Sequence, residues 1–207
     1  DLLDGKALPG ALKRLGVVFT PVFNVDGHAR RGRFHRPNQD GPAEQGARTT
    51  AQRINLNRDY VIAQAPEMRA MLRFLGAWDP VVFADLHVTD GARLRHEVSI
   101  STAPTRYGAP ALAAEARDLA ARVTADLSAR GYAPLDFYPL LVDAADPRRG
   151  FELEVDTPRL STAYWGLRNR IGVLVEDHAW LDFASRVKVC RDTVLALVRD
   201  VAERGAT

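Results

Sequence analysis

Three apolar runs of strand length recur along this chain, and they constrain its fold more than any other feature. They are VVFTPVF (17–23), VVFADLHV (81–88) and IGVLVED (171–177), and FYPLLVD (137–143) is a weaker fourth candidate. The first three are continuous rather than alternating, which suits strands that are covered on both faces. The runs therefore predict a sheet buried between two layers.

Amphipathic helical patterns lie between and after these runs. Apolar residues recur every three or four positions in residues 66–78, 109–131 and 183–205. The second pattern ends at Gly131, a residue type that often terminates helices. Strands that alternate with long helices predict an α/β layered domain with a mixed or largely parallel sheet.

The composition fits one globular domain and excludes several classes of protein. The chain has 207 residues, 46% of them hydrophobic, which is enough for a sizeable core. Its net charge is +2 and its arginines are dispersed, so nucleic-acid binding is not indicated. A single cysteine, Cys190, excludes an internal disulfide and a CxxC metal site. No apolar run approaches the roughly 20 residues that span a bilayer, so no membrane partner is expected.

Polar side chains follow or end these runs, at the edge where open α/β sheets bind ligands. His87 and Glu176 each stand at the end of an apolar run. Asp85 precedes His87 by two residues, so both lie on one side of a strand and Asp85 could orient the imidazole. His87 is thus either a metal ligand or an ordinary loop histidine. Glu176 is either a general base prepared by burial or a carboxylate that faces water.

The long segment 24–58 interrupts the alternation of strands and helices. It is rich in Arg, Asn, Gly and Gln, it lacks an apolar period, and such stretches are usually functional or disordered. Near its end, Asn57 and Arg58 are adjacent, and an amide beside a guanidinium can hold a carboxylate. Arg36 in the same segment could present a second guanidinium. The alternative for the Asn57–Arg58 pair is a turn with a solvated arginine.

Four motifs, taken in order, resemble the zinc carboxypeptidases related to carboxypeptidase A. They are TPVFNVDGHAR (20–30), NLNRDY (55–60), VFADLHVTDGA (82–92) and LRNRIGVLVEDH (167–178). The likeness extends from about residue 15 to about residue 203 and is greatest to a bacterial subgroup with a long insertion between the first two motifs. It implies that residues 1–207 are a partial catalytic domain, a three-layer α/β fold with a mixed, largely parallel sheet that lacks its first strands.

The resemblance also implies a reaction, the removal of the C-terminal residue of a peptide with one Zn²⁺ ion as cofactor. His87 would be a zinc ligand, and Glu176 would activate the zinc-bound water and pass its proton to the leaving amine. Asn57 and Arg58 would grip the terminal carboxylate of the peptide. Arg36 would polarise the scissile carbonyl.

The family also has a tyrosine that closes over the substrate. Tyr164 is the candidate here, although its spacing to Glu176 is shorter than the family's. The family is often exported, so the resemblance is compatible with a periplasmic or secreted protein. It leaves the compartment, the oligomeric state and the preferred substrate side chain open.

One part of the family pattern is missing. The first two zinc ligands of the family come from an H-x-x-E motif, which this sequence does not contain; its five histidines are His28, His35, His87, His96 and His178. In the family that motif lies upstream of the part that residues 1–15 resemble. We therefore expect either a fragment of an ordinary enzyme or a natural short form, with weak zinc affinity and little activity alone.

Two other functions stay open at this point. One is a non-catalytic peptide- or carboxylate-binding module on the same fold. The other is a zinc amidase or deacylase that acts on small acylated amino acids, which fold similarity does not exclude.

Overall fold

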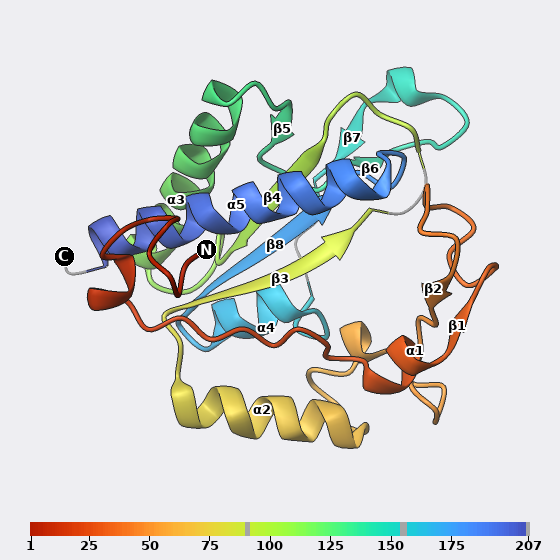
Figure 1. Ribbon diagram of the computed structural model, residues 1–207, viewed down its shortest axis with the longest axis horizontal. Coiled ribbons are helices and arrows are strands. Elements are labelled where there is room, and N and C mark those ends of the chain that lie inside the picture. The colour runs from red at the N-terminus through yellow and green to blue at the C-terminus, as the bar shows by residue number, and fades with distance from the viewer. Residues whose placement is uncertain (90–91, 154–156, 206–207) are drawn as a thin grey trace.

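The computed structural model describes residues 1–89, 92–153 and 157–205 (Figure 1). Its centre is a four-stranded sheet in the order β3–β8–β4–β5. These strands are β3 (Val82–Val88), β8 (Ile171–Asp177), β4 (Val98–Ala103) and β5 (Pro134–Leu135). β3 is parallel to β8, β4 is antiparallel to β8, and β5 is parallel to β4. The predicted α/β class with a mixed sheet is confirmed.

Helices cover both faces of this sheet, which gives three layers (Figure 1). On one face, α3 (Pro110–Ala129) and α5 (Phe183–Arg204) pack on each other and on the apolar side chains of β4 and β8 in the main core. On the other face, α4 (Ser161–Leu167) contacts β3, β8 and β4. The helix α2 (Pro66–Trp78) lies outside α4, where its Met68 shares a second apolar cluster with Tyr164. No described helix has both the length and the apolar character needed to cross a membrane.

Short elements complete the described chain. The hairpins β1 (Arg31–Gly32) with β2 (Gln45–Gly46) and β6 (Leu140–Leu141) with β7 (Phe151–Glu152) are both antiparallel. The other short elements are α1 (Val25–Ala29) and the 3₁₀ helices η1 (Ala11–Lys13), η2 (Leu56–Arg58) and η3 (Pro147–Arg149).

The elements agree with the sequence predictions where a pattern is local. The three predicted helices form within two residues of their expected ends, and the predicted strands near 81–88 and 171–177 are β3 and β8. The strand predicted at 17–23 is wrong, because no described strand pairs with this segment. The weaker candidate at 137–143 contributes only the two residues of β6.

Candidate active site

The strand register places a row of polar side chains on the α4 face of the sheet. His87 of β3 is opposite Glu176 of β8, which in turn is opposite Ser99 of β4. Because side chains alternate between faces along a strand, Asp85 and Ser101, which both lie opposite Leu174, are on the same face of the sheet. The opposite face of β8 holds apolar residues of the main core. The sheet thus separates a polar face from an apolar one at its centre.

The start of α4 closes one side of this row. Trp165 of α4 packs on Phe83 with ring centroids 5.6 Å apart, which places the helix on the face that carries Asp85. The Ser161 hydroxyl at the first position of α4 forms a hydrogen bond with Asp85. The Asp85 carboxylate is therefore fixed from two directions, by Ser161 and by His87.

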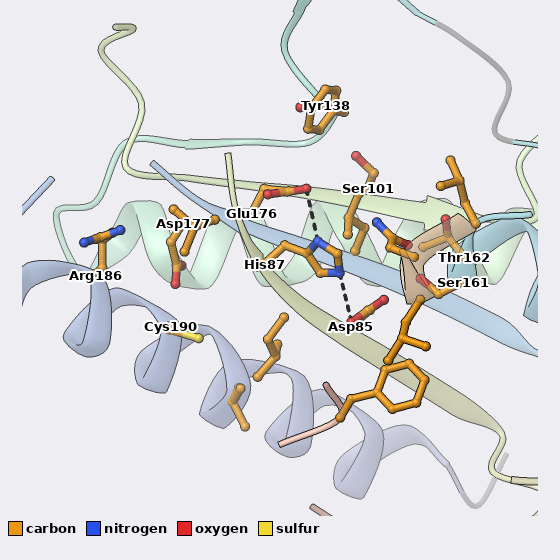
Figure 2. Close-up of a pocket in the computed structure, with 18 of the residues that line it drawn as sticks. Asp85, His87, Ser101, Tyr138, Ser161, Thr162, Glu176, Asp177, Arg186 and Cys190 are labelled. Carbon is orange, nitrogen blue, oxygen red and sulfur yellow. Dashed lines mark ion pairs between the residues drawn. The ribbon is translucent and has the colours of Figure 1, made fainter. Parts of the chain in front are cut away.

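His87 lies between two carboxylates (Figure 2). Its Nε2 is 3.0 Å from Oδ1 of Asp85, and its Nδ1 is 3.7 Å from Oε1 of Glu176. The His87 side chain is 24% exposed and that of Glu176 only 9%. The first distance is that of a hydrogen bond, whereas the second is too long for one. Nε2 is therefore engaged by Asp85, while Nδ1 is directed toward Glu176.

Electrostatics in this group favour a protonated imidazole when no cation is bound. Burial by itself lowers the pKa of His87, but Asp85, through its charge and its hydrogen bond, and then Glu176 raise it to about 9, with Arg36 opposing them. For Asp85 the effects have the opposite sign. Burial raises the pKa of this carboxylate, but the neighbouring His87 and the hydrogen bond with Ser161 outweigh burial, so the pKa is lowered overall. Any ligand that binds through His87 Nδ1 must therefore displace a proton.

The predicted binding residues of segment 24–58 line the same cavity, which has a volume of about 1980 Å³. Arg36, Asn57 and Arg58 all contribute to its wall, and Arg36 is near enough to His87 to act on its pKa. Asn57 and Arg58 form η2, which is anchored by the buried Leu56. Nη1 of Arg58 donates to the main-chain carbonyl oxygen of Asn57 at 2.8 Å, which holds the guanidinium against the preceding peptide.

The N-x-D-G part of the first motif braces the surrounding loops. Asn24 Oδ1 accepts a hydrogen bond from Gly27 N (2.9 Å), and its amide nitrogen donates to the carbonyl oxygen of Ala47 (3.3 Å). The Asp26 carboxylate accepts from Ala51 N at 2.8 Å. A Cβ atom at Gly27 would lie 2.3 Å from the Ala47 carbonyl oxygen, so only glycine fits there. The motif therefore has a structural role that holds the wall of the cavity.

Tyr164 is not among the residues that line the cavity. It packs on Tyr60, with ring centroids 5.4 Å apart, and edge-on against Trp165. It is a half-buried member of the second apolar cluster, and its substrate-capping role stays a prediction. Tyr138 does line the cavity.

Several residues of the candidate site are not predicted from the sequence. Ser99, Ser101 and Ser161 belong to elements that it does not predict, and a serine carries little signal by itself. Tyr138 lies within the weak strand candidate at 137–143, but nothing in that run marks it as a site residue. Only the register of β4 with β8 brings the serines of β4 to Glu176, and this pairing is not visible in the sequence.

The described residues do not form a complete metal site. Within residues 1–89, 92–153 and 157–205, no group of three or more His, Cys, Asp or Glu side chains is arranged to hold a metal ion. A catalytic zinc ion normally has three protein ligands and an open position. His87 fits the role of one ligand, through Nδ1, and these residues do not supply the others.

Two solved structures share this arrangement of strands and helices. A metallo-carboxypeptidase from Pseudomonas aeruginosa, in complex with (2-guanidinoethylmercapto)succinic acid, matches with a TM-score of 0.55 and 16% identity over 76% of this chain and 42% of its own. A metallo-carboxypeptidase from Burkholderia cenocepacia matches with a TM-score of 0.50 and 13% identity over 78% of this chain and 41% of its own. The chain has the metallo-carboxypeptidase fold.

The metallo-carboxypeptidase likeness concerns the fold, at identities far below those that show a shared activity. The chain spans about two fifths of the length of these two structures. No family model and no curated protein matches it. The activity therefore has to be argued from the site.

Proposed function

We propose that these residues form part of the active site of a zinc-dependent metallo-carboxypeptidase, which hydrolyses the C-terminal peptide bond of a peptide. The observation that carries the proposal is the position of His87 and Glu176, paired on adjacent parallel strands with side-chain atoms 3.7 Å apart. The cavity around them also receives Arg36, Asn57 and Arg58. A nearly buried carboxylate beside a histidine and several guanidinium groups suits hydrolysis of an acyl bond.

Each residue has a distinct task in this proposal. Glu176 takes a proton from the attacking water and later gives it to the leaving amine. Arg36 donates to the scissile carbonyl oxygen as negative charge develops there. Asn57 and Arg58 bind the terminal carboxylate of the peptide, since a planar guanidinium matches the two carboxylate oxygens. The bound ligand of the Pseudomonas structure, a succinic acid derivative, is also a carboxylate.

Zinc would be held in part by His87, and we propose that its remaining protein ligands lie outside the residues that the structure describes. When bound, the ion supplies Lewis acidity to the carbonyl and to the attacking water. A single histidine holds zinc weakly. We therefore expect a polypeptide of residues 1–207 to hydrolyse peptides poorly.

The test is the substitution Glu176→Gln in the natural-length protein with zinc present. Loss of the general base should lower kcat for an N-acylated dipeptide by about 10²- to 10⁴-fold. The affinity for the same dipeptide should change little, because Asn57 and Arg58 remain. Glu115→Gln is the matched control, since this carboxylate lies on α3 with its side chain 50% exposed and pairs with Arg122.

Two outcomes would count against the proposal. Unchanged turnover in the Glu176→Gln protein would remove the general base from the reaction. A wild-type protein that binds peptide carboxylates but never hydrolyses them would instead support a non-catalytic binding module. That second candidate is favoured by the lack of a three-ligand metal group among the described residues.

A further inference from the structure

The loop that follows Arg36 is fastened to the end of β8. Gln39 N donates to the carbonyl oxygen of Arg36 at 3.2 Å, which forms a turn, and Asp40 N donates to the carbonyl oxygen of Ala179 at 2.8 Å. Ala179 is three residues beyond Glu176. The turn that carries Arg36 is thus joined by the main chain to the segment that carries the candidate general base.

A second fastening comes from Arg186 on α5. Its Nη2 donates to the carbonyl oxygen of Asp40 at 2.6 Å and also to that of Gly41. The residue is only 4% exposed, which is unusual for an arginine. The loop therefore meets a rigid donor that projects from a 22-residue helix.

The surroundings of Arg186 show what keeps a buried guanidinium there. Burial lowers its pKa, while the carboxylates of Asp177, Asp40 and Asp182 raise it. Asp177 also stands between α5 and β8, directly after Glu176 (Figure 2). Burying a charge costs free energy unless the charge is paired and hydrogen-bonded. The two loop carbonyls are part of that compensation, so the loop and the arginine fix each other.

The contact between Arg186 and the loop affects the candidate active site, because the same loop carries Arg36. Arg36 begins the fastened turn, lines the cavity and lies close enough to His87 to influence its charge state. In a site of this kind, a displacement of about 1 Å can lower the rate about a hundredfold.

We propose that Arg186 is a positioning residue, which clamps the loop Arg36–Pro42 so that the Arg36 guanidinium stays close to His87 in the cavity. The proposal rests on the proposed function, in which Arg36 stabilises charge on the scissile carbonyl. Arg186 itself acts only through the loop and does not contact the substrate.

The experiment compares three variants of the natural-length protein. Arg186→Met removes the donors but keeps an apolar side chain of some length, and Arg186→Lys keeps a charge and a single donor group. Arg199→Met is the control, because Arg199 also projects from α5 but pairs with Asp126 instead of the loop. Hydrogen exchange at the amides of residues 39–41 and the kcat and KM for an N-acylated dipeptide are measured for each, with the thermal midpoint as a check of folding.

We expect Arg186→Met to exchange about 10- to 100-fold faster at residues 39–41, because a charged hydrogen-bond anchor is lost. We also expect kcat to fall about 10- to 100-fold at nearly constant KM, with Arg186→Lys intermediate in both and Arg199→Met unchanged. If Arg186→Met fails to fold, the Arg186→Lys protein decides: wild-type exchange and wild-type kcat in it would overturn the proposal.

The two proposals fail in different ways. Wild-type exchange at residues 39–41 in a folded Arg186→Met protein would overturn the clamp, whatever the activity. Faster exchange with unchanged kcat would overturn the positioning role. A wild-type protein with no turnover at all would refute the proposed function, and the exchange rates would still decide whether Arg186 clamps the loop.

Discussion

Two histidines outside the proposed reaction, His96 and His178, form a buried stack with ring centroids 4.7 Å apart. His178 Nε2 accepts a hydrogen bond from Leu94 N at 3.2 Å, whereas within the described chain neither ring nitrogen of His96 has a hydrogen-bond partner. Burial and then the neighbouring ring lower the pKa of His96 to about 4, and burial also lowers the pKa of His178. Both rings are therefore neutral at pH 7.

We predict that this stack makes the protein less stable as the pH falls from about 6.5 to about 4. In that window unfolded His96 is protonated and folded His96 is not, so the unfolded state binds more protons. The loss from His96 alone is on the order of 3 kcal/mol. Urea unfolding at a series of pH values should show a smaller loss in His96→Phe than in wild type.

The control for this prediction is His35→Gln, because His35 is exposed. Asp177 acts in the opposite sense, since burial raises its pKa to about 7, so folded Asp177 takes up its proton first as the pH falls. Comparison with wild type at each pH cancels that contribution. An identical pH dependence in His96→Phe and wild type would exclude the stack as its source.

Among the elements, β8 and α4 are in unusually close contact at Gly172. A Cβ atom there would lie 2.6 Å from the carbonyl oxygen and 2.7 Å from the Cα atom of Thr162, both main-chain atoms. The helix could accept a larger residue only by moving away from the sheet. Ser161, the neighbour of Thr162, would move with it and release Asp85.

We therefore predict that Gly172→Ala destabilises the protein by about 1–3 kcal/mol, the usual cost of overpacking. Gly76→Ala is a matched control for which we expect the free energy of unfolding to rise instead of fall. Gly76 lies in α2 with open space around a Cβ atom, and alanine there should stabilise the helix by about 0.5–1 kcal/mol. Thermal unfolding of both variants measures the difference, and equal midpoints would contradict it.

The elements also show how far the sequence alone could predict this molecule. The helices at 66–78 and 183–204 follow from local periodicity, and β8 follows from an apolar run. β4 is not predicted, because the predicted strands are continuous apolar runs, whereas apolar and hydroxyl residues alternate in Val98–Ala103, which is the pattern of a strand with one polar face. Residues 17–23 have the composition of a strand, but a strand also needs a partner, and pairing is not local.

The same distinction applies to the candidate site. Asp85, His87 and Glu176 can be found from the sequence because each lies at the end of an apolar run. Arg186 cannot, since its hydrogen-bond partner Asp40 is 146 residues away in the chain. Contacts of that kind depend on how the layers are stacked, and no sequence pattern reports them.

For the molecule as a whole, the exposed β3 edge of the central sheet is the feature that most favours self-association. Within the described residues β3 pairs only with β8, and it carries Leu86 at 45% exposure. Phe183 and Val187 of α5 are 53% and 52% exposed and line the same cavity as Leu86. An unpaired strand edge beside apolar side chains is a template for association.

We predict that a polypeptide of residues 1–207 self-associates with rising concentration, and that Leu86→Lys reduces this. Lysine on an edge strand opposes pairing with another chain. Light scattering over a concentration series measures the apparent mass. Ile62→Lys, at a site that is 73% exposed and outside the sheet, should associate like wild type. A monomer at all concentrations would contradict the prediction.

The register of β8 also determines which changes of chain length the candidate site can tolerate. Deletion of one residue between Ile171 and Val175 would turn Glu176 toward α3 and α5 and bring Asp177, which is one methylene shorter, opposite His87. A deletion of the same size in the exposed turn near Pro147–Arg149 would leave the row intact. We therefore expect homologues of this chain to vary in length at that turn, while β3 and β8 keep a constant length.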